Sequence, residues 1–508
     1  MNQIEPQDRF PTFRRIGRKA LRVAKWLGKA ILVLLVIGVV ANGIMSFIFG
    51  RRLAAKIEAI KAEGGIIALA DFGKPKVPDS ENAAVVYDKA FKLISTKQAG
   101  KDLRVLDDFL RSAERAKRPE LWDQAHSAVR KHAVVISIVE EAVKRPKCQY
   151  PVNWDAGAQT LFPHLFKIRR LVRILDSNAI LQARDGNVDE AVRSLKLSYA
   201  VGESLKDEAH LIPQLVRISA TAISSRALLE VVETGKISEA QAGRLYDALG
   251  ERDFGAGFVR AMQCERAMGI WVFNSTRRGG SLTGEEGRRM PKLLWALFID
   301  AWRPISYADE ILYLDAMNRI VDHASQPFRA PNLRAALMEP DFPWYAIISR
   351  IMFPVFTRAR AKCDEAEART AGDRIMLALI TYKARYGAYP GNLAELRAKL
   401  GWKIEEDAFS GKDFIYKPKG AGFLLYSIGE NLKDDGARVH VLILPAIRLP
   451  SAPTSESPGI PPPPVSQYTN APPGPLPAPA PPSTPPPGFV YMNAKGEQTA
   501  DIVWELER

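Results

Sequence analysis

Residues 30–49 have the sequence AILVLLVIGVVANGIMSFIF, the most apolar stretch of the chain. They carry no charge, and Asn42 is the only strongly polar side chain among them. As a helix rising about 1.5 Å per residue, they would extend about 30 Å, the thickness of the hydrocarbon layer of a bilayer. We therefore predict a transmembrane anchor at residues 29–50. The alternative, a buried core helix, is usually shorter and amphipathic.

Basic residues flank this stretch unequally. Residues 1–29 contain eight Lys and Arg, whereas the four basic residues within 50–63 are diluted by Glu58 and Glu63. The positive-inside rule then keeps residues 1–28 as a cytoplasmic tail and places the bulk of the chain outside the cytoplasm. A cleaved signal peptide is the rival interpretation, but residues 46–50 supply no small-x-small cleavage site. We expect a single-pass protein of the inner, or cytoplasmic, membrane with a retained anchor.

The net charge of +14 does not predict a nucleic-acid partner, because +8 of it belongs to residues 1–52. The lipid bilayer, with anionic headgroups, is the expected partner of this basic tail. The 508 residues, 47% of them hydrophobic, suffice for two or three domains.

Cysteine and histidine usage predicts no His/Cys metal site. Cys148, Cys264 and Cys363 are too few and too widely spaced for a disulfide framework, although one bridge among them stays open. The six histidines are scattered, and neither Cys-x-x-Cys nor His-x-x-x-His occurs.

Apolar residues at spacings of three and four predict a helical domain over residues 51–338, built from antiparallel hairpins. Asp79 or Ser80 is the expected cap of its first helix, and Ser238 the cap of Glu239–Leu249. The main predicted helices are Leu103–Ala116, Leu121–Lys144, Leu161–Asp185, Val188–Leu205, Leu211–Glu233, Phe258–Phe273, Leu293–Trp302, Ile305–Val321 and Phe356–Tyr386.

One predicted hairpin, at residues 179–196, resembles the helix–turn–helix of tetratricopeptide-type repeats. Gly186 allows the turn, and Asp189 can start the second helix. A true array would repeat about every 34 residues, and only one clear copy is present.

Glu265 and Arg266 lie among apolar residues in the predicted helix Phe258–Phe273. A structural ion pair is the favoured interpretation, and a catalytic pair is the alternative.

Residues 371–436 contain several short motifs in a fixed order. A helix ends at Tyr386-Gly387-x-Tyr389-Pro390, and Leu393–Leu400 forms another. A turn at 407–411 (DAFSG) then precedes two predicted strands, at Phe414-x-Tyr416 and Phe423–Gly429. This order resembles the head domain of the major pseudopilin of type II secretion systems. The resemblance implies a small α+β head, but no pseudopilin processing site precedes Trp344, so filament assembly is not expected.

In such pseudopilins the loop after the last strand binds calcium. The resemblance places the Ile428 carbonyl, Asn431, Asp434, Asp435 and Asp501 at corresponding positions, with Asn431 where the family has an acid. Oxygen ligands suit Ca²⁺. A solvated acidic turn is the alternative, and no other cofactor is expected.

Residues 450–488 interrupt this head with a proline-rich insert, which we expect to be disordered. The predicted organisation is thus mostly α, followed by an α+β head. Its parts are the tail at 1–28, the anchor at 29–50, the helical domain at 51–338, the long helix and head at 339–449, the insert at 450–488 and the final strands at 489–508.

The layout also resembles a kind of membrane-anchored protein from planctomycete-like bacteria, which implies an architecture but no known activity. The residues that carry this resemblance are Gly73, Pro75, Asn82, Ala83, Ala84 and Tyr87.

The expected function is non-enzymatic: a structural or interaction component of the bacterial cell envelope, associated with a type II secretion-like system and with other envelope or secretion proteins. An envelope scaffold unrelated to secretion is one alternative. A hydrolase that uses Glu265 or another buried acid is the other, although no Gly-x-Ser-x-Gly, His-Glu-x-x-His, phosphate-loop or Rossmann motif occurs.

Overall fold

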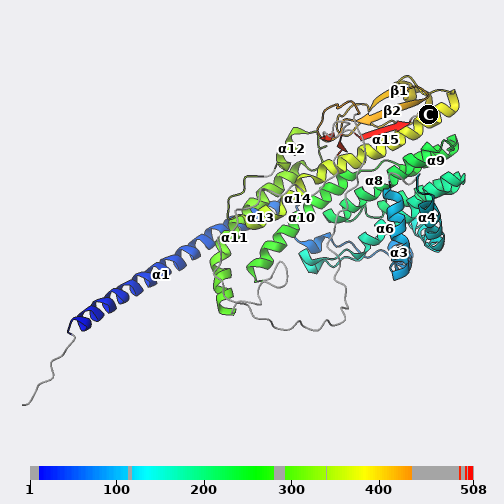
Figure 1. Cartoon of the computed structure of the whole chain (residues 1–508). Helices are drawn as coiled ribbons and strands as arrows, with labels where there is room; N and C mark the ends of the chain where they lie inside the picture. Colours follow the sequence, from blue (N-terminus) through cyan, green and yellow to red (C-terminus); the bar gives the residue numbers. More distant parts are fainter. Residues whose placement is uncertain are drawn as a thin grey trace, which may run out of the picture.

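The computed structural model describes residues 11–112, 117–279, 292–338, 340–437, 491–492, 498–499 and 502–506. Within these ranges the chain is mostly helical, with a few short strands, which confirms the predicted α class. One long helix projects from a body of packed helices, and a small sheet lies at the far end of that body (Figure 1). The proline-rich insert and Asp501 lie outside the described residues.

The projecting helix is α1, Pro11–Ala62. Its portion Lys25–Ala62 is the only helix of the described part of the chain that is long and apolar enough to cross a membrane. The body does not cover its most apolar window, which argues against a core helix. Farther along, Leu53 and Ile60 are buried in the body, so the same helix enters the hydrophobic core.

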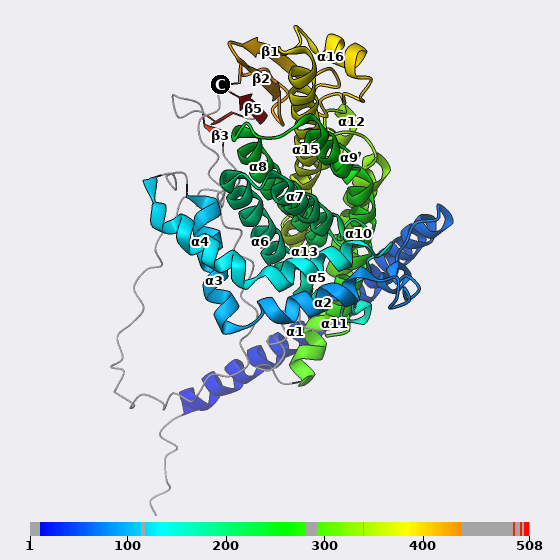
Figure 2. The same cartoon turned by 90° about the vertical axis from the view of Figure 1, so that its right-hand side faces the viewer.

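Helices make up most of the body (Figure 2). Their bounds are α2 Ala83–Ile94, α3 Lys97–Arg111, α4 Pro119–Lys131, α5 Ala133–Val143, α6 Pro163–Asp185, α7 Val188–Glu203, α8 Leu211–Glu233, α9 Glu239–Leu249 and α10 Phe254–Arg277, with 3₁₀ turns at Leu69–Phe72 and Trp154–Gln159. The predicted helix Leu121–Lys144 is divided at His132 into α4 and α5.

The predicted hairpin is formed by α6 and α7. Gly186 ends α6 with φ 88°, a left-handed conformation that favours glycine. Ala183 and Ala191 are fully buried between packed helices, where their small side chains permit close approach. The hairpin is therefore present, while its kinship with tetratricopeptide repeats stays a prediction.

The amino terminus of α2 corrects the predicted cap. Neither Asp79 nor Ser80 caps it. Instead, the Asn82 side chain accepts a hydrogen bond from the Ala84 backbone N–H at 3.1 Å. The same side chain exchanges two hydrogen bonds with the backbone of Gln149, at 2.9 and 3.0 Å. Asn82 thus fixes the strand-like segment after α5 to the start of α2.

Helix α11, Lys292–His323, replaces the two helices predicted at Leu293–Trp302 and Ile305–Val321. Pro304 lies inside it, and the helix continues through the proline. It packs along α1, where Lys56 forms an ion pair with Asp315. Three short helices follow: α12 Pro331–Leu337, α13 Ile347–Met352 and α14 Pro354–Thr357.

The carboxyl-terminal region places a sheet on the long helix α15, Ala359–Tyr386. After α16, Leu393–Leu400, the chain forms β1 Ile415–Lys419 and β2 Gly422–Ser427. The sheet order is β1-β2-β5, both pairs being antiparallel, with β5 at Ile502–Leu506. The predicted hairpin and last strand are confirmed, but β3 (Tyr491–Met492) pairs with β4 (Gln498–Thr499) in a separate small sheet.

Helix α15 belongs to both halves of the molecule. It packs against α8, α9 and α10 of the helical body and also against β2 and β5. One hydrophobic cluster includes Val231 and Leu245 from the body together with Phe423 and Leu425 from the sheet. The domain boundary at 338/339 stays a prediction, and the core is continuous across it.

Candidate functional site

The loop after β2 holds four of the five predicted calcium ligands. Gly429, Leu432, Gly436 and Ala437 have φ between 55° and 74°. Positive φ is uncommon for Leu and Ala, so the loop is tightly coiled. Tight coiling brings backbone and side-chain oxygens of residues 428–437 near one another.

Internal hydrogen bonds occupy the side chains of this loop. Asp434 Oδ1 accepts from the Tyr426 hydroxyl at 3.0 Å and from the Gly436 N–H at 2.8 Å. Asp435 Oδ2 accepts from Asn431 Nδ2 at 2.8 Å. The carboxylates therefore stabilise the loop itself, as they would in a solvated acidic turn.

The calcium site stays a prediction. Asp501, the fifth predicted ligand, lies outside the described residues. Among the residues that the structure describes, no three His, Cys, Asp or Glu side chains are arranged to hold a metal ion. Such a search does not count the Ile428 carbonyl or the Asn431 amide, which are two of the predicted ligands.

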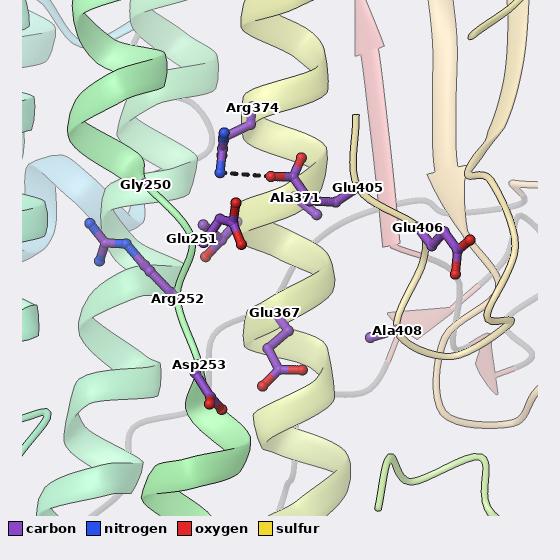
Figure 3. Close-up of a pocket in the computed structure, with 11 residues that line it drawn as sticks. Gly250, Glu251, Arg252, Asp253, Glu367, Ala371, Arg374, Glu405, Glu406 and Ala408 are labelled. Atoms are coloured by element: carbon purple, nitrogen blue, oxygen red, sulfur yellow. Dashed lines mark ion pairs between the residues drawn. The ribbon is translucent and has the colours of Figure 1, made fainter. Parts of the chain in front are cut away.

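A charged pocket of about 360 Å³ lies where the helical body meets the carboxyl-terminal region (Figure 3). Three segments line it: the α9–α10 connection, one face of α15, and residues 405–408 before β1. Its charged residues are Glu251, Arg252, Asp253, Glu367, Arg374, Glu405 and Glu406. Five of these seven side chains are acidic. Glu405 pairs with Arg374 and Glu251 pairs with Lys403. The negative charge that suits a cationic group therefore rests on Asp253, Glu367 and Glu406.

Ion pairs join two of the three segments to each other and the third to α7. Arg374 of α15 pairs with Glu405 at 2.6 Å, the contact drawn in Figure 3. Arg252 points away from α15 and pairs with Glu203 of α7 at 3.1 Å. Burial raises the pKa of Glu405, with the Arg374 guanidinium opposing the shift. The pocket therefore lies at a contact between packed segments of the chain.

Three buried or half-buried carboxylates cap helices that belong to other parts of the chain. Glu367 accepts hydrogen bonds from the backbone N–H groups of Phe254 and Gly255, at 3.0 and 2.8 Å, at the start of α10. Glu265 accepts from the N–H of Leu211, the first residue of α8, at 3.2 Å. Asp309 accepts from the backbone N–H groups of Ile348 and Ser349, the second and third residues of α13. The first backbone N–H groups of a helix lack partners within it, and these acids supply them.

The predicted Glu265–Arg266 ion pair is wrong. Successive residues of a helix do not face each other, and among the described ion pairs none joins these two. Arg266 instead donates to Asn318 Oδ1 at 3.0 Å. Burial raises the pKa of Glu265 to about 7, and the Leu211 N–H partly opposes the shift.

All three cysteines are free thiols, so the bridge left open by the sequence is absent from the structure. Burial raises the pKa of Cys148 and of Cys363 to about 12, and it raises the pKa of Cys264 as well. These thiols are therefore protonated and weakly nucleophilic near neutral pH.

The sequence did not reveal the pocket or the interhelical caps. The pocket and the cap of Glu367 on Phe254 join segments more than a hundred residues apart. The caps made by Glu265 and Asp309 span 54 and 39 residues, which is also beyond the reach of a local pattern. Comparison of the chain with models of protein families, with curated proteins and with solved structures finds no match.

Proposed function

We propose that this chain is a membrane-anchored structural and interaction protein of the bacterial cell envelope, with its body outside the cytoplasm. The observation that carries the proposal is the continuity of α1. The helix passes without a break from an uncovered apolar span into the core, where Leu53 and Ile60 are buried. Its ion pair with Asp315 adds a second link between anchor and body.

The use of buried acids supports a structural rather than a catalytic role. Glu265, the residue named for the hydrolase alternative, caps α8, and Glu367 caps α10. A general acid or base must reach a substrate proton within hydrogen-bond distance. A carboxylate that accepts hydrogen bonds from the backbone N–H groups of a helix terminus stabilises the fold, and its oxygen is already occupied by those donors.

The acidic pocket is the proposed contact for a partner. Glu406 is exposed at its rim, while Glu367 and Arg374 line its α15 wall. Rim charges steer association and set specificity more than they add affinity. We propose that a basic segment of another envelope protein binds here.

Association with a secretion-type assembly is the finer part of the proposal. It is supported by the sequence motifs and by the β1–β2 hairpin packed on a long helix. An envelope scaffold unrelated to secretion has the same anchor and the same pocket. The identity of the captured partners separates the two.

The experiment is in-cell crosslinking of the full-length protein in its host's membranes, followed by affinity capture and mass spectrometry. A Glu406→Gln variant should lose partners that need the acidic rim. Glu120→Gln is the matched control, because Glu120 is an exposed glutamate at the start of α4, outside the pocket lining.

Enriched pseudopilins or a secretin would support the secretion assignment. A reproducible set of other envelope proteins would favour the scaffold. Identical partner sets for Glu406→Gln and wild type would refute the pocket as the contact. Recovery of the chain in the soluble fraction after alkaline extraction of the membranes would refute the anchor.

A calcium-bound loop is the remaining part of the proposal. Titration calorimetry of the full chain should give a heat of Ca²⁺ binding that Asp434→Asn weakens. No binding at about 1 mM Ca²⁺, the weak end of the range for extracellular sites, would end it.

A further inference from the structure

Pro304 creates a local defect in α11. Proline has no backbone N–H, so it cannot donate the helical hydrogen bond to the carbonyl four residues earlier, which is that of Asp300. A carbonyl left without a donor is costly wherever water is scarce.

Asn42 repairs this defect from the neighbouring helix. Its side-chain Nδ2 donates to the Asp300 carbonyl oxygen at 3.0 Å. Asn42 is also the strongly polar residue of the apolar stretch 30–49. A hydrogen bond between these two helices thus pairs the one polar side chain of the anchor with the one carbonyl that Pro304 leaves free.

Further contacts fix the direction of α11 relative to α1. The Tyr307 ring lies against Gly50, so close that a Cβ added to Gly50 would be 3.5 Å from the ring. Farther along both helices, Lys56 pairs with Asp315. The contacts therefore advance in the same direction on both helices, from Asn42–Asp300 through Gly50–Tyr307 to Lys56–Asp315. The two helices run parallel.

This register places Asp300 beside the span of α1. Asn42 lies about 10 Å before Phe49 along the helix axis, at about 1.5 Å per residue. Residues 293–299, LLWALFI, precede Asp300 and are entirely apolar. Arg277, at the end of α10, pairs with Glu310, so α10 ends level with the later part of α11. The first part of α11 extends past the end of α10 and bends away from α1 at a steep angle (Figure 1).

We propose that residues 293–299 form a second membrane-contacting element, which enters the extracytoplasmic leaflet where Asp300 meets Asn42 and contacts phospholipid. Three observations identify phospholipid as the contact: the segment adjoins the apolar span of α1, its own sequence is apolar, and Asn42 pairs with the Asp300 carbonyl. Arg303 follows this segment, is exposed and pairs with Asp300 at 3.3 Å. Its long side chain can extend its charge toward the headgroups, where Arg is favoured. This inference rests on the proposed anchor.

The test is lipid quenching of a fluorophore on the full chain in vesicles of phosphatidylcholine and phosphatidylglycerol. Single cysteines are introduced at each of residues 293–299 and labelled with an environment-sensitive dye. Doxyl lipids then report contact with the acyl region. The native cysteines react slowly near neutral pH, because burial raises the pKa of Cys148 and Cys363 to about 12.

Two positions calibrate the measurement. Val36→Cys, exposed on α1, reports the anchor itself, and Ala398→Cys, exposed on α16 at the far end of the body, reports background. Residues 293–299 should lose fluorescence with a helical period, well above the Ala398→Cys level.

The outcomes separate the two proposals. Quenching at Val36→Cys with none at residues 293–299 would overturn this inference and leave the anchor in place. Quenching at neither would overturn the anchor as well. A loss of fluorescence at residues 293–299 that is equally large in vesicles without doxyl lipid would expose an artefact and overturn the inference.

Discussion

Replacing Asn42 by leucine should weaken the contact between α1 and α11. The substitution removes the donor at 3.0 Å from the Asp300 carbonyl, and Pro304 offers none in its place. Side-chain hydrogen bonds between membrane helices contribute about 0.6 kcal/mol on average and up to about 1.7 kcal/mol. A buried polar group left without a partner costs about 1–3 kcal/mol. We expect a loss of about 1–2 kcal/mol in the free energy of unfolding.

The second arm of this prediction is a rescue. Pro304→Ala supplies the missing backbone N–H, which can bond the Asp300 carbonyl within α11. In that background Asn42→Leu should cost almost nothing, so the two substitutions are not additive. The free energies come from SDS titration of the full chain in mixed micelles, followed by tryptophan fluorescence.

Ser46→Ala is the control. Ser46 lies one turn farther along α1, and its hydroxyl is buried without a hydrogen-bond partner. Its removal should not lower stability, because no hydrogen bond is lost. Equal losses for Asn42→Leu with proline or alanine at 304 would refute the reasoning, since the amide would then act through something other than this carbonyl.

Three further predictions concern the body. Burial opposes ionisation of Glu365, but the charges of Arg369 and Lys362 outweigh burial and lower its pKa to about 2. The ionised side chain should therefore contribute about 2–3 kcal/mol to the free energy of unfolding above pH 4.5, and this contribution should vanish as the pH falls toward 2. Glu365→Gln should accordingly reduce the pH dependence of acid unfolding followed by circular dichroism. Gly269→Ala should destabilise the body by at least about 2 kcal/mol in thermal unfolding, because a Cβ there would lie 2.1 Å from the Tyr313 ring, whereas a neutral result would mean that the ring can move. Burial raises the pKa of Glu265 from 4.5 to about 7. Stability should therefore fall as the pH rises from about 4.5 to about 7, because only the unfolded chain loses this proton there, and Glu265→Gln should be more stable relative to wild type at pH 8.5 than at pH 5. An activity lost in this folded variant would instead support the hydrolase alternative.

Local patterns predicted the helices well where one face repeats and a cap is present. The bounds of α8, Leu211–Glu233, and of α9, Glu239–Leu249, agree with the sequence prediction, and Ser238 forms a capping box with Gln241. Pro304 misled the prediction, because proline normally ends a helix. A donor on another helix, Asn42, satisfies the carbonyl that makes an internal proline costly.

Local sequence patterns could not predict which distant segments of the chain come together in the fold. The pocket brings residues 250–253, 367–374 and 405–408 together, and no motif links them in the sequence. Glu265 and Arg266 are adjacent in sequence, which suggested a pair, but the helix turns them toward different partners. The calcium ligands depend on a loop whose last predicted member, Asp501, lies beyond the described residues.

Helix α15 has a mechanical consequence. It is 28 residues long, which corresponds to about 42 Å of rigid rod, and it leads from α14 away from the side on which α1 projects (Figure 1). Because both the helical body and the sheet pack on this rod, the sheet does not swing on a flexible tether. With α1 in the bilayer, this rigid helix holds the sheet at a fixed distance from the membrane surface. A partner anchored in the same membrane would then need its contact surface at the same distance from the bilayer. This distance would restrict which partners can bind, whatever the side chains at the contact.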